Sequence, residues 1–260
     1  RVYRYNFFFD NCATRPAALI EKVVGQVDYH YPYTSQTFRS LINYCTRHHA
    51  WLTFGCDLAL GSPTDQEATP HEMLFLPDYL REAFAKAEII DTQGQHRPLV
   101  SKTHVIEAAE PDELEKDLWD LLSPLRLGWL IFAITNVITL LGRFQKRAYK
   151  GLDILLFGLA GLAGCVLFFL AFFSVHPCTW PNYSLLWLHP FHLVGVILFC
   201  INKAQRATYW YHFINFAALT LLFAGWAFLP QQLNPAFIPL AASLWLRSAR
   251  GINKKKWTTE

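Results

Sequence analysis

Residues 5–15 read YNFFFDNCATR, and this stretch organises the first half of the chain. The preceding run Val2–Phe9 is rich in β-branched and aromatic residues, which fits a strand buried on both faces, although periodicity alone does not separate such an apolar run from a helix. The apolar run stops at Asp10 and Asn11, and Cys12 follows immediately. We therefore expect Cys12 to lie just after a buried strand, where the chain enters its next element.

The residues after Cys12 carry the signals of a helix from Ala13 to Val24. The preceding Asp-Asn pair offers N-cap side chains, Pro16 is tolerated in a first turn, and Gly25 is a typical helix stop. Unpaired amides at a helix start and the positive end of the helix dipole favour a thiolate. The pattern predicts that Cys12 is the nucleophile of the protein.

The rest of the first half alternates helical and extended patterns, which indicates an α+β domain over residues 1–106. A capping box, Thr69 to Glu72, opens one of its helices. The predicted elements are a helix over 34–49, an apolar segment over 51–60 that ends at a Gly-Ser-Pro turn, a helix over 69–87, and a hairpin of strands 87–91 and 98–106.

The two halves of the chain differ sharply in charge and in apolar content. Residues 1–123 hold 11 Lys/Arg against 18 Asp/Glu, a net charge of −7, whereas residues 124–260 hold 12 against 2, a net charge of +10. The whole chain is 53% hydrophobic and 16% aromatic, which is too apolar for an ordinary soluble domain. An acidic linker over 107–124 separates the halves.

The second half contains apolar segments near the roughly 20 residues needed to cross a bilayer. We expect an all-α transmembrane domain over 125–250 and a basic tail over 251–260. The predicted spans are 125–141, 154–173, 184–201, 208–229 and a shorter one over 236–246 that contains Pro239.

Basic residues lie on one side of these predicted spans. Eleven Lys and Arg follow the first, third and fifth spans, whereas the connections 174–183 and 230–235 contain none. The positive-inside rule places the basic side and the C-terminus in the cytoplasm, with the acidic domain outside. The domain that contains Cys12 is therefore expected outside the cytoplasm.

Six cysteines and an extracytoplasmic location permit disulfides. Cys45 and Cys56 form a candidate pair, with two separate buried thiols as the alternative. Cys178 beside His176 could bind a ligand or react, but one Cys and one His do not make a metal site. The sequence therefore indicates no metal and no cofactor.

Four other polar residues have open alternatives. Asn11 could orient a catalytic histidine or cap the helix, and Arg15 could pair with Asp10 or contact a lipid phosphate. His189 and His192 fall toward the outer end of the third span, where they could meet a lipid substrate or pack inside the bundle.

Three segments together resemble a known family: YNFFFDNCATRP (5–16), WLTFGCDLALGSPTD (51–65) and EMLFLPDYL (72–80). They are similar to Bacteroidetes membrane proteins with an extracytoplasmic, circularly permuted papain-like (NlpC-like) thiol domain ahead of transmembrane helices. More narrowly, the chain resembles the Bacteroides-type lipoprotein N-acyltransferases. The resemblance covers most of residues 1–90 and the helical tail.

The resemblance implies an enzyme whose nucleophile is Cys12. The family's catalytic histidine belongs to a segment upstream of the cysteine, so no histidine of this sequence inherits that role. The chain begins at Arg1 without Met, and we expect it to be part of a longer protein. The implied partners are a phospholipid acyl donor, a diacylated lipoprotein acceptor and the membrane, without nucleic acid.

Two other classes of function fit the same residues. A papain-like thiol domain could be a membrane-anchored cysteine peptidase, amidase or lipase. The apolar residues beside Cys12 also fit a scaffold without catalysis, in which this cysteine is buried. The products formed from a labelled phospholipid and a diacyl lipopeptide would separate the three.

Overall fold

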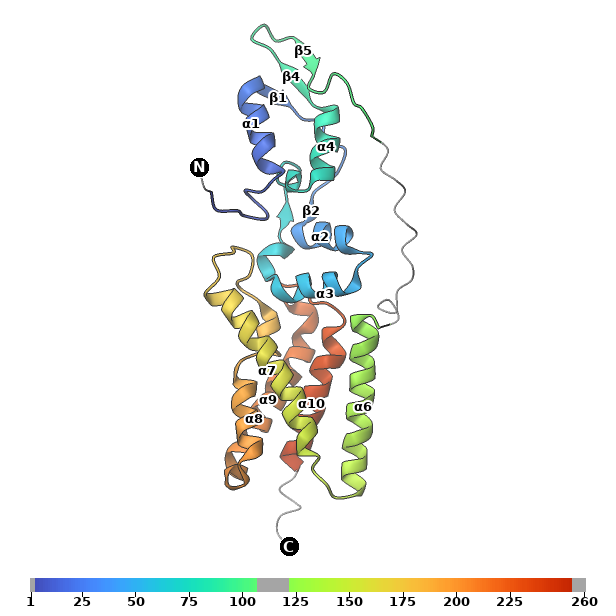
Figure 1. Cartoon of the computed structure of the whole chain (residues 1–260), viewed down its shortest axis with the longest axis vertical. Coiled ribbons are helices and arrows are strands. Elements are labelled where there is room, and N and C mark those ends of the chain that lie inside the picture. The colour runs from blue at the N-terminus through green and yellow to red at the C-terminus, as the bar shows by residue number, and fades with distance from the viewer. Residues whose placement is uncertain (1–2, 107–121, 254–260) are drawn as a thin grey trace. The chain divides into compact units, whose positions relative to one another are not determined.

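The computed structural model describes residues 3–106 and 122–253, so most of the predicted linker and tail lies outside the described residues. The chain divides into two compact units (Figure 1). The first comprises residues 1–41 and 66–115, and the second comprises residues 42–65 and 116–260. The segment predicted as one domain over 1–106 is therefore divided, because residues 42–65 group with the apolar helices.

The first unit contains short helices and two small antiparallel sheets. Its three-stranded sheet has the order β1-β4-β5, with Val27 opposite Ile89 and Ile89 opposite Arg97. The elements are α1 (Thr14–Val24), β1 (Gln26–Asp28), β2 (Gln36–Thr37), the start of α2 (Phe38–Thr46), β3 (Glu67–Ala68), η2 (Glu72–Phe75), α4 (Pro77–Lys86), β4 (Glu88–Ile90) and β5 (His96–Pro98). Strands of two or three residues do not confirm a papain-like fold, which stays a prediction.

The strand predicted over Val2–Phe9 is wrong for the described residues 3–9, which contain a tight turn. Asn6 Oδ1 accepts hydrogen bonds from the amides of Phe8 at 3.2 Å and Phe9 at 3.3 Å, and two backbone bonds join Asn6 to Asp10. Side chains of this type offer the backbone a local alternative to a sheet ladder. The turn buries Phe8 in the core, where its side chain is 1% exposed. The apolar residues of this run therefore indicated a buried segment, but that segment is not extended.

The helix predictions hold where local capping decides the boundary. α1 ends at Gly25 with φ of 88°, and Thr69 with Glu72 forms the predicted capping box: the Thr69 amide donates to Glu72 Oε2 at 2.8 Å. The helix predicted over 69–87 is interrupted before Pro77, which has no amide hydrogen to continue it. The helix predicted over 34–49 is shorter, and the hairpin forms with 96–98 as its second strand.

The second unit is a bundle of apolar helices, and four of its helical segments are long and apolar enough to cross a membrane. They match the first four predicted spans. Their bounds are Pro124–Phe144, Lys150–Phe172, Tyr183–Cys200 and Asn202–Phe228. The helices of the unit are α3 (Ala50–Ala59), α6 (Pro124–Phe144), α7 (Lys150–Phe172), η3 (Tyr183–Leu186), α8 (Phe191–Cys200), η4 (Asn202–Ala204), α9 (Gln205–Gly225), η5 (Trp226–Phe228) and α10 (Phe237–Asn253).

The predicted fifth span corresponds to α10, which has 17 residues and packs against α6 and α9. At about 1.5 Å per residue a helix of this length is about 25 Å long, slightly shorter than the hydrocarbon core. Pro239 is tolerated because it lies in the first turn of the helix. A fifth crossing of the bilayer by α10 stays a prediction.

Close helix packing in this unit depends on glycine. A Cβ atom on Gly164 of α7 would lie 2.6–2.7 Å from the backbone of His189, and one on Gly161 would lie 2.8 Å from Leu193. Small residues let transmembrane helices approach closely. Such close packing stabilises the bundle, because lipid supplies no hydrophobic force between the helices. The glycines of α7 therefore allow its close contact with α8 and with the residues just before α8.

A buried ion pair joins α7 to α10 inside the bundle. Arg247 Nε donates to Asp153 Oδ1 at 2.6 Å, and both side chains are less than 5% exposed. The same guanidinium donates to Thr139 Oγ1 at 2.9 Å and to the Ala148 carbonyl at 3.0 Å. Charges in a membrane interior are tolerated when they are paired in this way.

Amide side chains attach α3 and the residues after it to connections of the bundle. This accounts for the grouping of residues 42–65 with the membrane helices. The bonds run from Asn182 Nδ2 to the Leu58 carbonyl (2.9 Å), from Gln231 Nε2 to the Leu60 carbonyl (3.0 Å) and from Asn234 Nδ2 to Asp57 Oδ2 (2.8 Å). Asp57 thus holds the connection that contains Asn234.

Candidate functional site

Cys12 lies on the surface of the first unit, two residues before the first turn of α1. Its thiol is exposed and forms no disulfide. The side chain is therefore accessible to a reactant, which disfavours the scaffold interpretation in which this cysteine is buried.

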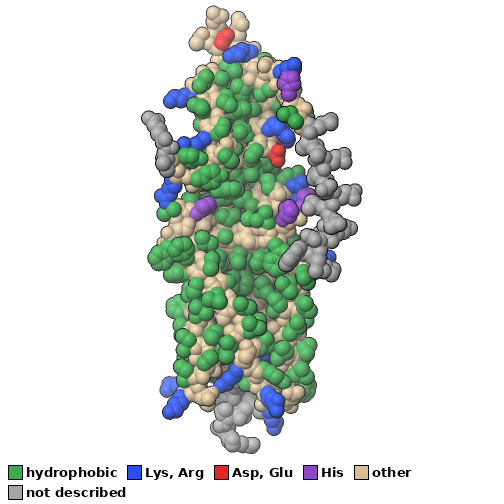
Figure 2. All heavy atoms as spheres, viewed as in Figure 1, with side chains coloured by type: hydrophobic (Ala, Val, Ile, Leu, Met, Phe, Trp, Pro, Cys, Tyr) green, Lys and Arg blue, Asp and Glu red, His purple; other side chains and the backbone are tan. Residues whose placement is uncertain are grey.

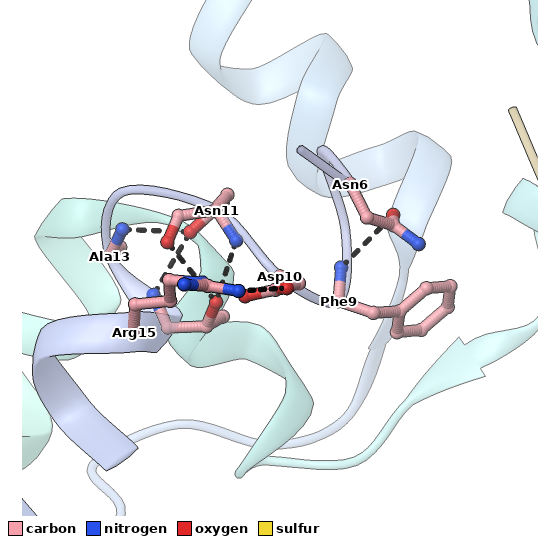
Figure 3. A network of polar contacts seen from close by, with 7 residues as sticks. Asn6, Phe9, Asp10, Asn11, Ala13 and Arg15 are labelled. Atoms are coloured by element: carbon pink, nitrogen blue, oxygen red, sulfur yellow. Dashed lines mark hydrogen bonds and ion pairs between the residues drawn. The ribbon is translucent and has the colours of Figure 1, made fainter. Parts of the chain in front are cut away.

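Asn11 holds the backbone around Cys12 (Figure 3). It is 3% exposed, and its Oδ1 accepts from the amides of Ala13 at 2.7 Å and Thr14 at 2.9 Å. Its Nδ2 donates to the carbonyls of Phe7 and Phe75, both at 2.8 Å. Of the two roles left open by the sequence, the structure supports capping.

The same bonds change one expectation about Cys12. Amides at the helix start were expected to be unpaired, but those of Ala13 and Thr14 are occupied by Asn11. The amide of Cys12 itself interacts with the hydroxyl of Tyr5, which also interacts with the Cys12 thiol. Local desolvation, together with that thiol, raises the pKa of Tyr5 above its ordinary value of 10.0, so its hydroxyl stays protonated near neutral pH.

Tyr5 is thus a site residue that the sequence did not single out. The run of apolar residues around it indicated a strand, in which neighbouring side chains point to opposite faces. The turn between Asn6 and Asp10 instead folds the chain back. The Asn at position 6, whose side chain favours local turns, was the available signal.

Arg15 pairs with Asp10, which is one of the two roles that the sequence left open for it. Its Nε lies 2.6 Å from Asp10 Oδ1 and its Nη2 lies 2.9 Å from Oδ2, a bidentate contact (Figure 3). The guanidinium also lies 3.3 Å from the centre of the Tyr3 ring. The hydrogen bond from Arg15 lowers the pKa of Asp10.

A small pocket of about 260 Å³ adjoins this ion pair on one side of α1. Asp10, Arg15 and His71 are among the residues that line it. His71 Nδ1 is 3.0 Å from the Tyr31 hydroxyl. No histidine forms a hydrogen bond with the Cys12 thiol within residues 3–106 and 122–253, so the structure assigns no base to it.

The other predicted site residues lie apart from Cys12. Cys45 and Cys56 form no disulfide in the part of the chain that the structure describes, so the candidate pair is not formed. Cys178 is 4% exposed, and burial raises the pKa of its thiol to about 11. Such a thiol is unreactive at neutral pH, in contrast to the ligand or reactive roles considered for it.

His189 and His192 pack inside the second unit. His192 is fully buried, with Nδ1 2.7 Å from the Tyr211 hydroxyl and Nε2 2.9 Å from the Trp187 carbonyl. The ring of His189 stacks on it at 3.8 Å between centres. For His192 this favours the packed alternative over direct contact with lipid.

Side chains that could hold a metal are not grouped in the described ranges: no cluster of three His, Cys, Asp or Glu residues has a suitable arrangement there. The groups described close to Cys12 are its thiol, the Tyr5 phenol and the Asp10–Arg15 ion pair.

Comparison with known proteins identifies the second half of the chain. Residues 115–256 match the family model described as the Lnb transmembrane domain. No curated protein and no solved structure matched the chain. Since the family match spans more than half of the sequence, the protein belongs to the Lnb transmembrane domain family, the membrane domain of Lnb-type lipoprotein N-acyltransferases.

Proposed function

We propose that this protein is a lipoprotein N-acyltransferase that transfers an acyl chain from a phospholipid, through a thioester on Cys12, to the N-terminal amine of a diacylated lipoprotein. The observation that carries the proposal is an exposed thiol in a chain that belongs to the Lnb transmembrane domain family. Apolar helices in the same chain suit substrates that keep their acyl chains in a bilayer.

In the first half-reaction, the Cys12 thiolate attacks an ester carbonyl of the phospholipid. The carbon–oxygen ester bond breaks, and the departing alkoxide takes a proton and leaves as a lysophospholipid. The negative charge that develops on the carbonyl oxygen needs donors at its own position. We assign the Tyr5 hydroxyl, which interacts with the Cys12 thiol, as a donor to this oxygen.

In the second half-reaction, the free α-amine of the lipoprotein attacks the thioester carbonyl. The carbon–sulfur bond breaks, the amine loses a proton and the thiolate is regenerated. A thioester suits this step because a thiolate leaves more readily than an alkoxide when an amine attacks. A general base accepts this proton, and in the resembled family that base is a histidine.

Asn11 and Asp10 with Arg15 act as positioning residues in this scheme. Asn11 fixes the backbone on both sides of Cys12, and the ion pair joins the turn before the thiol to the first turn of α1. We propose the orientation that follows from the positive-inside rule: a periplasmic thiol domain, a cytoplasmic C-terminus and the bacterial inner membrane.

Intact-protein mass spectrometry of the full-length protein tests the intermediate. After incubation with phospholipid, we expect an added acyl mass that neutral hydroxylamine removes, and that is absent from Cys12→Ser. Cys45→Ser is the matched control, because it removes another exposed thiol and should leave the adduct intact. An adduct retained by Cys12→Ser as a thioester would reject the mechanism.

Product analysis separates the rival functions. With labelled phospholipid and a diacyl lipopeptide, a triacylated peptide supports the transferase. Free fatty acid as the main product would indicate a lipase, and cleaved peptide would indicate a peptidase. If neither substrate changes in the full-length protein, the catalytic proposal fails.

A further inference from the structure

The second unit contains a larger pocket, of about 860 Å³, at one end of its helices. It lies where α7 and α9 begin and where α8 and α10 end, so its lining comes from four helices. Figure 1 shows that the α6–α7 connection and the end of α10 lie at this same end of the bundle. Cys12 belongs to the other unit and takes no part in the pocket.

Two basic side chains border this pocket. Lys150 is the first residue of α7 and Arg206 is the second residue of α9, and both are exposed. Lys150 Nζ donates to Asn202 Oδ1 at 2.9 Å, which connects the start of α7 to the segment before α9. The starts of the two helices add positive potential through their dipoles.

The one acidic residue among the described lining does not cancel these charges. Asp153 is bonded to Arg247 at 2.6 Å inside the bundle, and both side chains of that pair are almost fully buried. The pair is neutral as a whole. Lys150 and Arg206 therefore leave the pocket with a net charge of about +2 at neutral pH.

The remaining lining is largely apolar and faces outward. Leu198, Ile201 and Trp210 border the pocket, with Ile201 48% exposed and Trp210 49% exposed. Figure 2 shows a hydrophobic lateral surface over the helices, with Lys and Arg gathered at the end of the bundle where the α6–α7 connection lies. Trp210 lies near the start of α9, and Trp residues near the ends of membrane-crossing helices are typical of the boundary between lipid tails and headgroups.

We propose that this pocket binds one anionic phospholipid from the leaflet at the basic end of the bundle. Its phosphate lies between Lys150 and Arg206, and its acyl chains lie along Ile201 and Trp210. Basic pockets between transmembrane helices recognise anionic headgroups through this combination of charge and apolar wall. The volume also falls in the range of about 300–1,000 Å³ that is usual for ligand sites. This lipid stays bound to the membrane domain and is a different molecule from the phospholipid that donates the acyl chain.

Native mass spectrometry of the full-length protein in detergent tests the site. The probes are phosphatidylglycerol and phosphatidylcholine with identical acyl chains, and inorganic phosphate as competitor. We expect one phosphatidylglycerol bound in preference to phosphatidylcholine. The double variant Lys150→Ala/Arg206→Ala should bind it about 30-fold more weakly, at roughly fivefold for each basic side chain.

A matched control removes the same charge at the same end outside the pocket. Arg147→Ala/Lys203→Ala should keep wild-type affinity, because neither residue lines the cavity. Lys150→Arg/Arg206→Lys should also bind, which separates lost charge from lost folding. Equal losses in both alanine variants, no preference for phosphatidylglycerol, or displacement by phosphate alone at equal concentration would each overturn the proposal.

Discussion

Replacing Asn11 by Ala should loosen the start of α1 and the backbone of Cys12. The substitution removes an oxygen that accepts from two amides, at 2.7 and 2.9 Å, and an amide that donates to two carbonyls at 2.8 Å. Loss of such a cap costs about 1 kcal/mol. The Phe75 carbonyl would lose this donor in a buried setting, at about 1–3 kcal/mol.

The carbonyl of Phe7 adds little to this total, because Phe7 is 39% exposed and water can replace the lost donor. We therefore expect a local destabilisation of about 2–4 kcal/mol. Hydrogen exchange of the amides of Ala13 and Thr14 reports it directly, since their opening should become about 30- to 1,000-fold more frequent.

Asn6→Ala is the matched control, because Asn6 also accepts from two amides but donates to no buried carbonyl in the described structure. Its effect should stay near 1 kcal/mol. If exchange at Ala13 and Thr14 in Asn11→Ala rose less than about tenfold, or no more than in Asn6→Ala, the role assigned to the buried amide would be refuted.

Three further outcomes are expected. Iodoacetamide should label Cys12 near pH 8 but not Cys178, because burial and a raised pKa protect the Cys178 thiol until the pH approaches about 11. Peptide mass spectrometry measures the labelling of each cysteine, and equal labelling at pH 8 would contradict this prediction. Because the pKa of Asp10 is lowered in the folded protein, its ion pair contributes fully to stability above the ordinary pKa of 3.8 and is lost as pH falls through the lower folded value. The free energy of unfolding of Asp10→Asn should therefore differ from that of the wild type at neutral pH and converge with it in acid. A difference that stays constant with pH would contradict the ion pair. Asp153→Asn should lower the free energy of unfolding in detergent by about 3–5 kcal/mol, because it leaves Arg247 buried without a counter-charge. The double change Asp153→Leu/Arg247→Met should restore most of the lost stability. Equal losses in the two variants would argue against the pairing.

Several features of the protein followed from short stretches of sequence. The four long apolar segments indicate membrane-crossing helices, because every backbone polar group in a bilayer must be satisfied within its own segment. The capping box at Thr69 and the stop at Gly25 followed for a similar reason, since both depend on residues within one turn. The place of a cysteine just before α1 belongs to the same class of local signals, whereas its exposure is a finding of the structure.

Contacts between distant residues decided the rest. Whether Tyr5 to Phe9 forms a strand depended on the Asn6 turn and on the partners that bury Phe8, and an apolar run does not distinguish a strand from a buried turn. The grouping of residues 42–65 with the membrane helices depends on Asn182, Gln231 and Asn234, which are more than a hundred residues away along the chain.

The two pockets and the buried Asp153–Arg247 pair are likewise products of tertiary structure. Sequence placed an acidic residue near the start of one span and a basic residue after another, but only packing brings their atoms to 2.6 Å. Sequence alone determined that this chain has an apolar helical half and a cysteine beside a helix start. Tertiary structure decided which amides, carbonyls and charges surround them, because those partners converge only when distant segments pack together.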